Sequence, residues 1–207
     1  MNPYKLPMRT ARAEFIEKKS RFIGHIARVS SAEEALAFLR SIREEHPTAN
    51  HNVYAYRLRE GGVCRYNDDG EPSGTAGMPV LDVFLKQDIY DFCCVATRYF
   101  GGIMLGGGGL IRAYSRCATV AIDASGIGMM REVTQCSAIL PYTLYEQVKR
   151  LFIASSAEII SEKFEVSVEI KIALPTEAVT PLQVGLTELT SGTVSLCVEG
   201  TVNQVFG

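Results

Sequence analysis

Residues 92–116 of this 207-residue chain read FCCVATRYFGGIMLGGGGLIRAYSR, and this stretch is the most informative part of the sequence about the fold. It opens with a short apolar run typical of a buried strand and closes with the apolar spacing of a helix. Between the two, residues 101–109 hold six of the eighteen glycines. Ordering glycine costs backbone entropy, so such a run in a folded domain serves positive φ angles or a close backbone approach. A strand, a glycine loop and a helix N-terminus flanked by arginines predict an anion-binding site.

The glycine loop does not match the two common nucleotide-binding signatures. A Walker A loop needs Lys and Ser or Thr where Gly107 and Gly108 stand, and Ile111 occupies the last position of a dinucleotide fingerprint. We therefore expect no cofactor, but a generic phosphate site made of backbone N–H groups and basic side chains. The alternative is that the glycines only let the loop pack against the sheet. The residues predicted to bind RNA or phosphate are Lys18, Lys19, Arg21, Arg98, Gly101, Gly102, Gly106, Gly107, Gly108, Gly109, Arg112 and Arg116.

The composition indicates an ordinary globular protein of two domains. Hydrophobic residues make up 47% of the chain and charged residues 21%, so both halves can bury a core. No apolar run approaches the roughly 20 residues that span a membrane, and the N-terminus lacks the apolar core of a signal peptide. We therefore expect a cytoplasmic protein with no membrane partner.

Charge is distributed unevenly, although the formal net charge is only −2. Residues 1–132 carry 17 basic and 15 acidic side chains, whereas residues 133–207 carry 4 and 8. Within residues 1–28 there are 7 basic side chains against 2 acidic ones. A polyanion such as RNA therefore fits the N-terminal part better than the acidic C-terminal part.

The six cysteines lie in apolar contexts and include no Cys-x-x-Cys pair. Because only three histidines accompany them, no spacing supports a structural zinc site, and we predict no metal. Reduced thiols in the core are expected instead. Cys93 and Cys94 stand side by side in one predicted strand and should point to opposite faces.

The first 125 residues predict three helices among short strands. A turn at 18–21 separates strands at 13–17 and 22–27. Ser30 or Ser31 caps a helix that runs to about Glu45, since residues 31–34 form a capping box. The remaining expected elements are strands at 52–58, 64–66 and 92–96 and helices at 79–86 and 110–125.

The elements after residue 133 follow the order βαββαβ, which is the ferredoxin-like arrangement. Strands are expected at 134–140, 158–164, 166–174 and 193–205, and helices at 144–155 and 175–191. The boundary falls at about 130–134. The chain is thus predicted to contain one domain of residues 1–132 and a second of residues 133–207.

A turn-rich loop at 67–77 brings acidic side chains close together. Asp68, Asp69 and Glu71 lack the alternating ligand spacing of a calcium loop, so a solvated turn whose Asp side chains accept local backbone hydrogen bonds is the preferred interpretation. The hydroxyl groups of this loop either cap the following helix or contact a ligand.

His51 is the one histidine in a polar context. No carboxylate partner for it can be identified from the sequence, and no serine stands in a nucleophile elbow, so we predict no catalytic residue. The residues assigned to a secondary surface are His51, Asp68, Asp69, Glu71, Ser73 and Thr75.

Five blocks occur in order along the chain: KSRF at 19–22, NHNVYAY at 50–56, DDGEPSGTAG at 68–77, RYFGG at 98–102 and LGGGGLIRAYS at 105–115. Together they resemble the IMPACT family, in its bacterial YigZ branch. The resemblance implies an α+β protein of two domains. The N-terminal domain would be similar to domain IV of elongation factor G and to a ribosomal-protein fold group, and the ferredoxin-like C-terminal domain similar to domain V of that factor. Eukaryotic relatives regulate translation.

The leading hypothesis is a non-enzymatic translation regulator that binds structured RNA or the ribosome through its N-terminal domain. It rests on the basic N-terminal strands, the glycine loop with its arginines, and the resemblance. One alternative is an enzyme or binder of a small phosphorylated or nucleotide ligand. Another is an adaptor that binds a protein partner through the acidic C-terminal domain. The sequence leaves the oligomeric state open.

Overall fold

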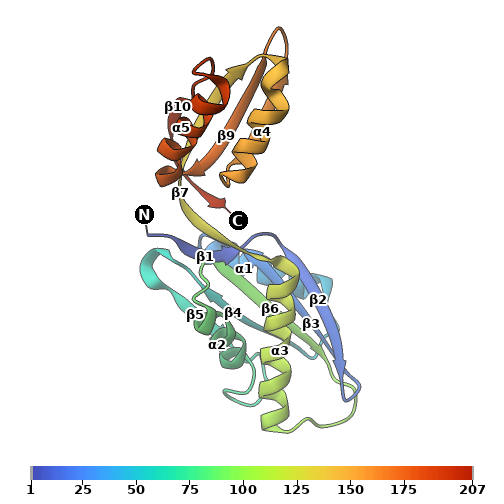
Figure 1. Ribbon diagram of the computed structural model, residues 1–207. Coiled ribbons are helices and arrows are strands. Elements are labelled where there is room, and N and C mark those ends of the chain that lie inside the picture. Colours follow the sequence, from blue (N-terminus) through green and yellow to red (C-terminus); the bar gives the residue numbers. More distant parts are fainter. Residues whose placement is uncertain (1, 207) are drawn as a thin grey trace. The chain divides into compact units, whose positions relative to one another are not determined.

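The computed structural model describes residues 2–206, which form two compact units (Figure 1). The N-terminal unit is Tyr4–Met129, and the C-terminal unit consists mainly of Met130–Phe206. Each unit combines helices with a sheet, which confirms the α+β class in two domains. The predicted boundary after residue 132 lies within strand β7 (Ile127–Leu140) and stays a prediction.

The N-terminal unit has three layers, with one sheet between helices (Figure 1). Its elements are β1 (Tyr4–Pro7), β2 (Ala11–Glu17), β3 (Ser20–Arg28), α1 (Ala32–Glu45), β4 (His51–Arg57), a 3-10 turn (Glu60–Gly62), β5 (Cys64–Asn67), α2 (Gly77–Gln87), β6 (Phe92–Tyr99) and α3 (Gly107–Ser125). The sheet order is β2-β3-β6-β4-β5, with antiparallel neighbours, while β1 pairs with β7.

Alternate side chains of β6 separate the two cores of this unit. Cys94 and Ala96 pack with α2 and α3 on one face, whereas Cys93 and Val95 pack with α1 on the other. The pleat of a strand sends successive side chains to opposite faces. The prediction that the adjacent cysteines diverge is therefore confirmed.

Helices α2 and α3 begin earlier than the sequence predicts, α2 at Gly77 rather than at residue 79. Helix α3 begins at Gly107, three residues before the predicted start, with Gly106 at φ 72° as its N-cap. Three glycines expected in the loop thus form the first helical turn. At α1, Ser31 caps as predicted, because its Oγ accepts from the backbone of Glu34 at 3.2 Å. The Glu34 carboxylate accepts from the N–H and the hydroxyl of Ser30, at 2.6 and 2.9 Å.

The C-terminal unit is the predicted ferredoxin-like arrangement. After β7 come a 3-10 turn (Tyr142–Leu144), α4 (Tyr145–Ala154), β8 (Glu158–Phe164), β9 (Val168–Pro175), a 3-10 turn (Thr176–Ala178), α5 (Val179–Thr190) and β10 (Cys197–Phe206). The sheet order is β10-β7-β9-β8, in which the first strand of the unit is central. Helices α4 and α5 close one apolar core against this sheet, with Phe152 and Ile170 fully buried.

The cysteines are all free, but they are not all in the core. Four are buried, Cys64 is half-buried and Cys197 is exposed at the start of β10. The expectation of six core thiols is wrong for Cys197, because it lies on β10, an edge strand that pairs with β7. Among the helices of residues 2–206, none combines the length and apolar character needed to cross a membrane.

Candidate functional site

The glycine loop lies directly against the tip of the β2–β3 hairpin. A Cβ added to Gly101 would overlap the backbone carbonyl group of Lys19, closer than any side chain can approach. The Gly101 N–H also donates to Ser20 Oγ at 3.2 Å. The glycine is therefore required for close approach, and it brings segments some 80 residues apart in the sequence onto one surface.

The hairpin tip itself is strained. Lys18 and Lys19 have φ angles of 45° and 64°, which suit a two-residue turn that matches the twist of the flanking strands. Asn and Gly are the residues that favour such turns, and positive φ is uncommon for lysine. Two lysines at this position are thus held outward by the fold at a conformational cost.

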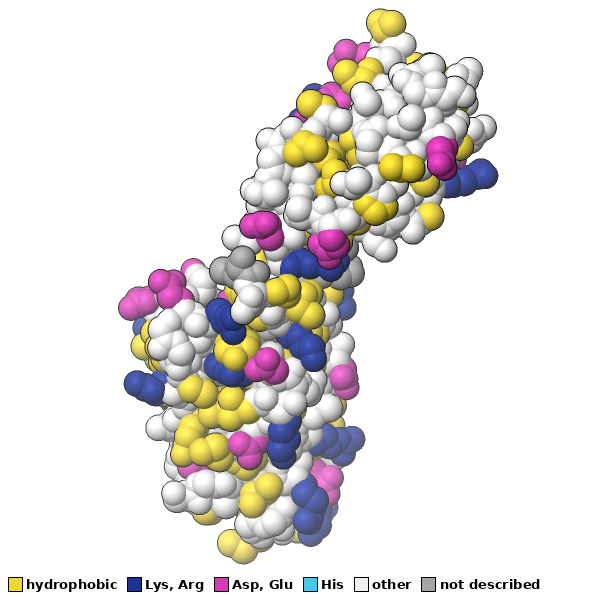
Figure 2. Space-filling view, turned by 60° about the vertical axis from the view of Figure 1, so that its left-hand side comes forward, with side chains coloured by type: hydrophobic (Ala, Val, Ile, Leu, Met, Phe, Trp, Pro, Cys, Tyr) yellow, Lys and Arg dark blue, Asp and Glu magenta, His cyan; other side chains and the backbone are white. Residues whose placement is uncertain are grey.

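A basic groove lies between this hairpin tip and helix α3. It encloses about 190 Å³ and is lined by Glu17, Lys18, Leu105, Gly109, Arg112, Ala113 and Arg116. Arg116 stacks on the Phe15 ring, 4.3 Å from its centroid, and stands 3.8 Å from Glu17. Within residues 2–206, Lys18, Lys19 and Arg112 form no ion pair, so their charges are available to an anion. In Figure 2, dark-blue Lys and Arg side chains are spread over the visible face of the N-terminal unit, several of them along its lower right side.

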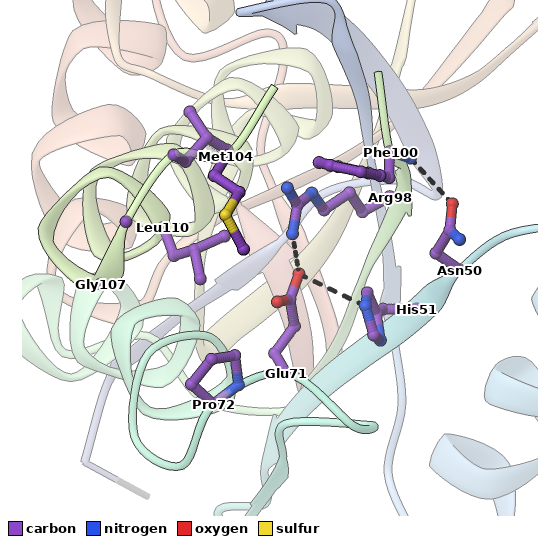
Figure 3. A pocket seen from close by; sticks show the side chains of 11 residues that line it. Asn50, His51, Glu71, Pro72, Arg98, Phe100, Met104, Gly107 and Leu110 are labelled. Atoms are coloured by element: carbon purple, nitrogen blue, oxygen red, sulfur yellow. Dashed lines mark hydrogen bonds and ion pairs between the residues drawn. The ribbon is translucent and has the colours of Figure 1, made fainter. Parts of the chain in front are cut away.

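A second cavity, the Glu71 pocket, lies beyond Leu105 and encloses about 330 Å³ (Figure 3). Leu105 lines both this pocket and the basic groove. Apolar side chains form most of its wall, while its floor is polar. The lining residues are Asn50, His51, Glu71, Pro72, Arg98, Phe100, Met104, Leu105, Gly106, Gly107 and Leu110.

Glu71 is the centre of the polar floor. Its Oε1 accepts from Arg98 Nη1 at 2.5 Å and from the Tyr114 hydroxyl at 2.7 Å. All three side chains are buried, and the ion pair neutralises both charges inside the unit. Burial, together with the hydrogen bond to Glu71, raises the pKa of Tyr114 far above its usual value, so this hydroxyl remains a donor. Arg98 Nε is buried without a partner among the described residues.

His51 faces the same carboxylate, with its Nε2 3.8 Å from Glu71 Oε1 (Figure 3). Its Nδ1 lies 2.8 Å from the Asp69 carbonyl oxygen, which can only accept, so Nδ1 carries the proton. Nε2 is therefore the ring nitrogen that faces Glu71. Gly70, at φ 88°, turns the loop so that its backbone passes beside the imidazole ring.

The two loop aspartates accept backbone hydrogen bonds, as predicted within the loop for Asp68 but from strand β4 for Asp69, whereas Glu71 is buried and binds side chains. Asp68 accepts from the N–H groups of Gly74, Ala76 and Gly77, so it caps helix α2 from eight or nine residues away. Asp69 accepts from the backbone N–H of Asn52 at 2.7 Å and pairs with a guanidinium of α1. These groups are already engaged by the protein, which fits the interpretation as a structured turn.

The loop hydroxyls do not cap α2. Thr75 donates to the Pro72 carbonyl oxygen at 2.6 Å, and Ser73 is exposed. The prediction that Ser73 or Thr75 caps α2 is therefore wrong, because Asp68 accepts from the N–H groups at the start of this helix.

The predicted phosphate-binding residues divide between two places. Lys18, Gly109, Arg112 and Arg116 line the groove, with Lys19 next to them at the hairpin tip. Placing Arg21 with them is wrong, because it alternates with Phe22 along β3 and so lies on the α1 face of the sheet, where it pairs with Glu14 at 2.6 Å. Gly102 and Gly106 supply positive φ angles in the loop, Gly106 and Gly107 line the Glu71 pocket, and Gly108 and Gly109 lie in the first turn of α3. Arg98, in contrast, is only 5% exposed and belongs to the Glu71 pocket.

The sequence does not predict the roles of Asn50 and Phe100, which line the pocket, or of Tyr114, which donates to Glu71. Tyr114 matches the buried stripe of an amphipathic helix, and nothing local marks its partner 43 positions earlier. Asn50 Oδ1 accepts from the backbone N–H of Phe100 at 2.8 Å, a contact between segments that only the sheet brings together. The carboxylate partner that His51 lacked in the sequence analysis is Glu71.

Fold and site together define a two-domain α+β protein whose N-terminal unit carries a basic groove next to a pocket with a buried ion pair. Residues 18–122 match the family model described as Impact N-terminal domain, and residues 139–193 match a domain of unknown function, DUF1949. This chain belongs to the IMPACT family.

The sequence aligns with bacterial members of the family over most of its length. It is 37% identical to "IMPACT family member YvyE" of Bacillus subtilis over 180 residues, covering 86% of this chain and 83% of that protein. It is 31% identical to "IMPACT family member YigZ" of Escherichia coli over 182 residues, covering 86% and 89%. A crystal structure described as a hypothetical protein aligns with a TM-score of 0.60 and 30% identity over 95% of this chain and 97% of that one.

Proposed function

We propose that this protein is a translation regulator that binds RNA through its N-terminal unit, with phosphates in the basic groove and one unpaired base in the Glu71 pocket. The observation that carries the proposal is the close approach of Gly101 to Lys19. This contact aligns the strained lysines of the hairpin tip with the arginines on the first turns of α3. The role in translation rests on membership of the IMPACT family, whose eukaryotic relatives regulate translation.

The groove suits phosphates rather than a folded protein surface. Lys18, Lys19 and Arg112 are exposed and unpaired within the described residues, and the N–H groups of the first turn of α3 are free of side-chain caps. Basic side chains next to a helix N-terminus bind phosphate oxygens without reading the base sequence. Such contacts position an RNA backbone and make its binding dependent on salt.

The pocket beside the groove suits a base. The Phe100 ring is 47% exposed and lies 5.4 Å from the Arg98 guanidinium carbon, so a planar ring can stack where this aromatic side chain meets the cavity. Arg98 offers donors and Glu71 an acceptor at the floor, which is the combination that the edge of a base requires. Since Leu105 lines both cavities, one nucleotide can place its phosphate in the groove and its base in the pocket.

The groove is tested by binding of a labelled RNA hairpin with one unpaired nucleotide, measured by fluorescence anisotropy over a salt series. The variant Lys18→Gln/Lys19→Gln/Arg112→Gln should weaken binding at least tenfold and lower the salt slope by about 2, because each phosphate that a basic side chain neutralises contributes roughly 0.7 to that slope. Arg40→Gln/Lys86→Gln/Arg150→Gln is the matched control, because it removes the same charge from exposed positions elsewhere. Equal losses in both variants would contradict a defined groove.

The pocket is tested with the same hairpin and its fully paired counterpart. Phe100→Ala should weaken binding of the bulged hairpin by about 1–3 kcal/mol, the usual contribution of one stacked base, and leave the paired hairpin unchanged. Phe164→Ala, at a 52% exposed ring of the C-terminal unit, is the control. Competition by a free nucleotide but not by RNA would favour the small-ligand alternative. If RNA binding is unchanged in both sets of variants, the RNA interface lies elsewhere on the protein and the proposal is wrong.

A further inference from the structure

Three side chains that could bind a metal meet on the face of the N-terminal sheet covered by α1. His25 lies in β3, Glu45 ends α1, and His46 is the C-cap residue of that helix. One ligand atom of each lies within 4.8 Å of the others. His25 points away from α3, because its neighbour Gly24 is the residue that contacts Cys117 of that helix. This cluster is therefore separate from the groove and the Glu71 pocket.

The two imidazoles carry the observation that points to a ligand. Nε2 of His25 and Nε2 of His46 are both buried and have no hydrogen-bond partner among the described residues. His25 is 3% exposed, His46 is 9% exposed, and their ring centroids lie 5.0 Å apart. An unpartnered buried nitrogen costs free energy, and one bound ion would satisfy both nitrogens.

We propose that His25, His46 and Glu45 bind a divalent transition metal of the zinc class. Two imidazole nitrogens and one carboxylate oxygen are a three-ligand set that leaves one tetrahedral position open to water. Such a mixed set, without thiolate and with only one carboxylate, selects against the oxygen-binding ions Mg²⁺ and Ca²⁺. A cavity of about 440 Å³, lined by His25 and Glu45 among others, gives an ion and its water access to the cluster.

The surroundings support ligand geometry. His46 Nδ1 lies 3.0 Å from the Tyr99 hydroxyl, which orients the ring and can accept the Nδ1 proton, leaving the Nε2 lone pair free. Burial also lowers the pKa of His25 to about 4, so this imidazole is neutral near pH 7, as a metal ligand must be. Glu45 Oε1 stands 3.6 Å from His46 Nε2, so small side-chain rotations bring the donors to bonding distance.

Arg12 competes with an ion for the Glu45 carboxylate. Its Nη1 lies 3.1 Å from Glu45 Oε1, the same oxygen that faces His46. Both side chains are about half exposed or more, so this surface pair is weak and Arg12 can swing into solvent when an ion binds. Removing the arginine charge should therefore tighten metal binding.

The test is titration of the full chain with Co²⁺, followed by displacement with Zn²⁺. We expect one equivalent of Co²⁺ to give the visible absorption of a four-coordinate site without thiolate charge-transfer bands. His25→Gln and His46→Gln should each weaken binding by more than the roughly 10–100-fold typical of an outer-shell change. His51→Gln removes the third histidine of the chain and should leave binding unchanged, whereas Arg12→Gln should strengthen it.

Folding of the variants is checked by circular dichroism, and the wild-type protein provides a second readout. Zn²⁺ should raise its melting temperature, because a ligand that binds only the folded state stabilises it, and Arg12→Gln should enlarge this shift. Thiolate bands would assign the ion to cysteine and overturn the proposal. So would loss of binding in His51→Gln, or wild-type protein that neither absorbs with Co²⁺ nor gains stability with Zn²⁺.

Discussion

The guanidinium of Arg98 donates to the carboxylate of Glu71 at 2.5 Å, although the two residues stand 27 positions apart. Both side chains are almost fully buried, at 6% and 4% exposure. Arg98 comes from the end of a central strand and Glu71 from a loop, and the pair forms the floor of the pocket. A buried charge is tolerated only with its partner, so this pair couples the loop to the sheet.

Removing one partner of this pair should be strongly destabilising. Arg98→Met is expected to lower the free energy of unfolding by about 3–5 kcal/mol, because it leaves the Glu71 charge buried without compensation. The double variant Glu71→Gln/Arg98→Met should lose less than the sum of the single variants. Urea unfolding of the three variants measures this coupling. Arg21→Met, which breaks the exposed pair with Glu14, is the control and should barely move the midpoint. Strictly additive losses would contradict the coupling.

The glycines of the loop should respond oppositely to alanine. Gly101→Ala places a Cβ in overlap with the Lys19 backbone, which must move, and should destabilise the protein by more than about 1 kcal/mol. Gly107→Ala meets no atom closer than 4.0 Å and lies in a helical turn, so it should stabilise by up to about 1 kcal/mol. Thermal melting compares the two variants. Equal effects would mean that close approach is not what Gly101 provides.

Asp68 should act as the cap of helix α2. Asp68→Ala leaves the N–H groups of Ala76 and Gly77 without their acceptor and should cost about 1–2 kcal/mol. Asp82→Ala, within the same helix, removes the same charge away from the N-terminal N–H groups and is the control. Chemical denaturation of both variants gives the comparison. A loss no greater than that of the control would show that the cap is dispensable.

Thiol reactivity should divide the cysteines by burial. Burial raises the pKa of Cys93 and of Cys117 to about 12, so neither forms a reactive thiolate at about pH 8. Exposed Cys197 should react first with a disulfide reagent, and half-buried Cys64, whose pKa burial also raises, more slowly. Mass spectrometry of the native protein during labelling measures the order in which the cysteines react. Rapid labelling of Cys93 would contradict the buried sheet face.

The sequence predicted the groove better than the pocket. Lys18, Lys19 and Arg112 stand beside local signals, a turn between strands and a glycine run before a helix, and both features are present in the structure. Arg98 stands beside the same glycines, yet the antiparallel pairing of β6 with β4 opposite His51 turns it into the pocket. Which face a strand residue takes depends on the pleat and the register. Periodicity over a short apolar run does not determine either one.

Local sequence was enough to specify most of the helices and strands, the βαββαβ order of the C-terminal unit and the loop in which aspartates accept backbone hydrogen bonds. Those features depend on neighbouring residues, through side-chain periodicity, caps and turns. The meeting of Glu71 with Arg98, Tyr114 and His51, and that of His25 with His46, depends on the tertiary structure alone. Such contacts join residues roughly 20 to 45 positions apart, and strand order and helix packing place them, so no local pattern encodes them.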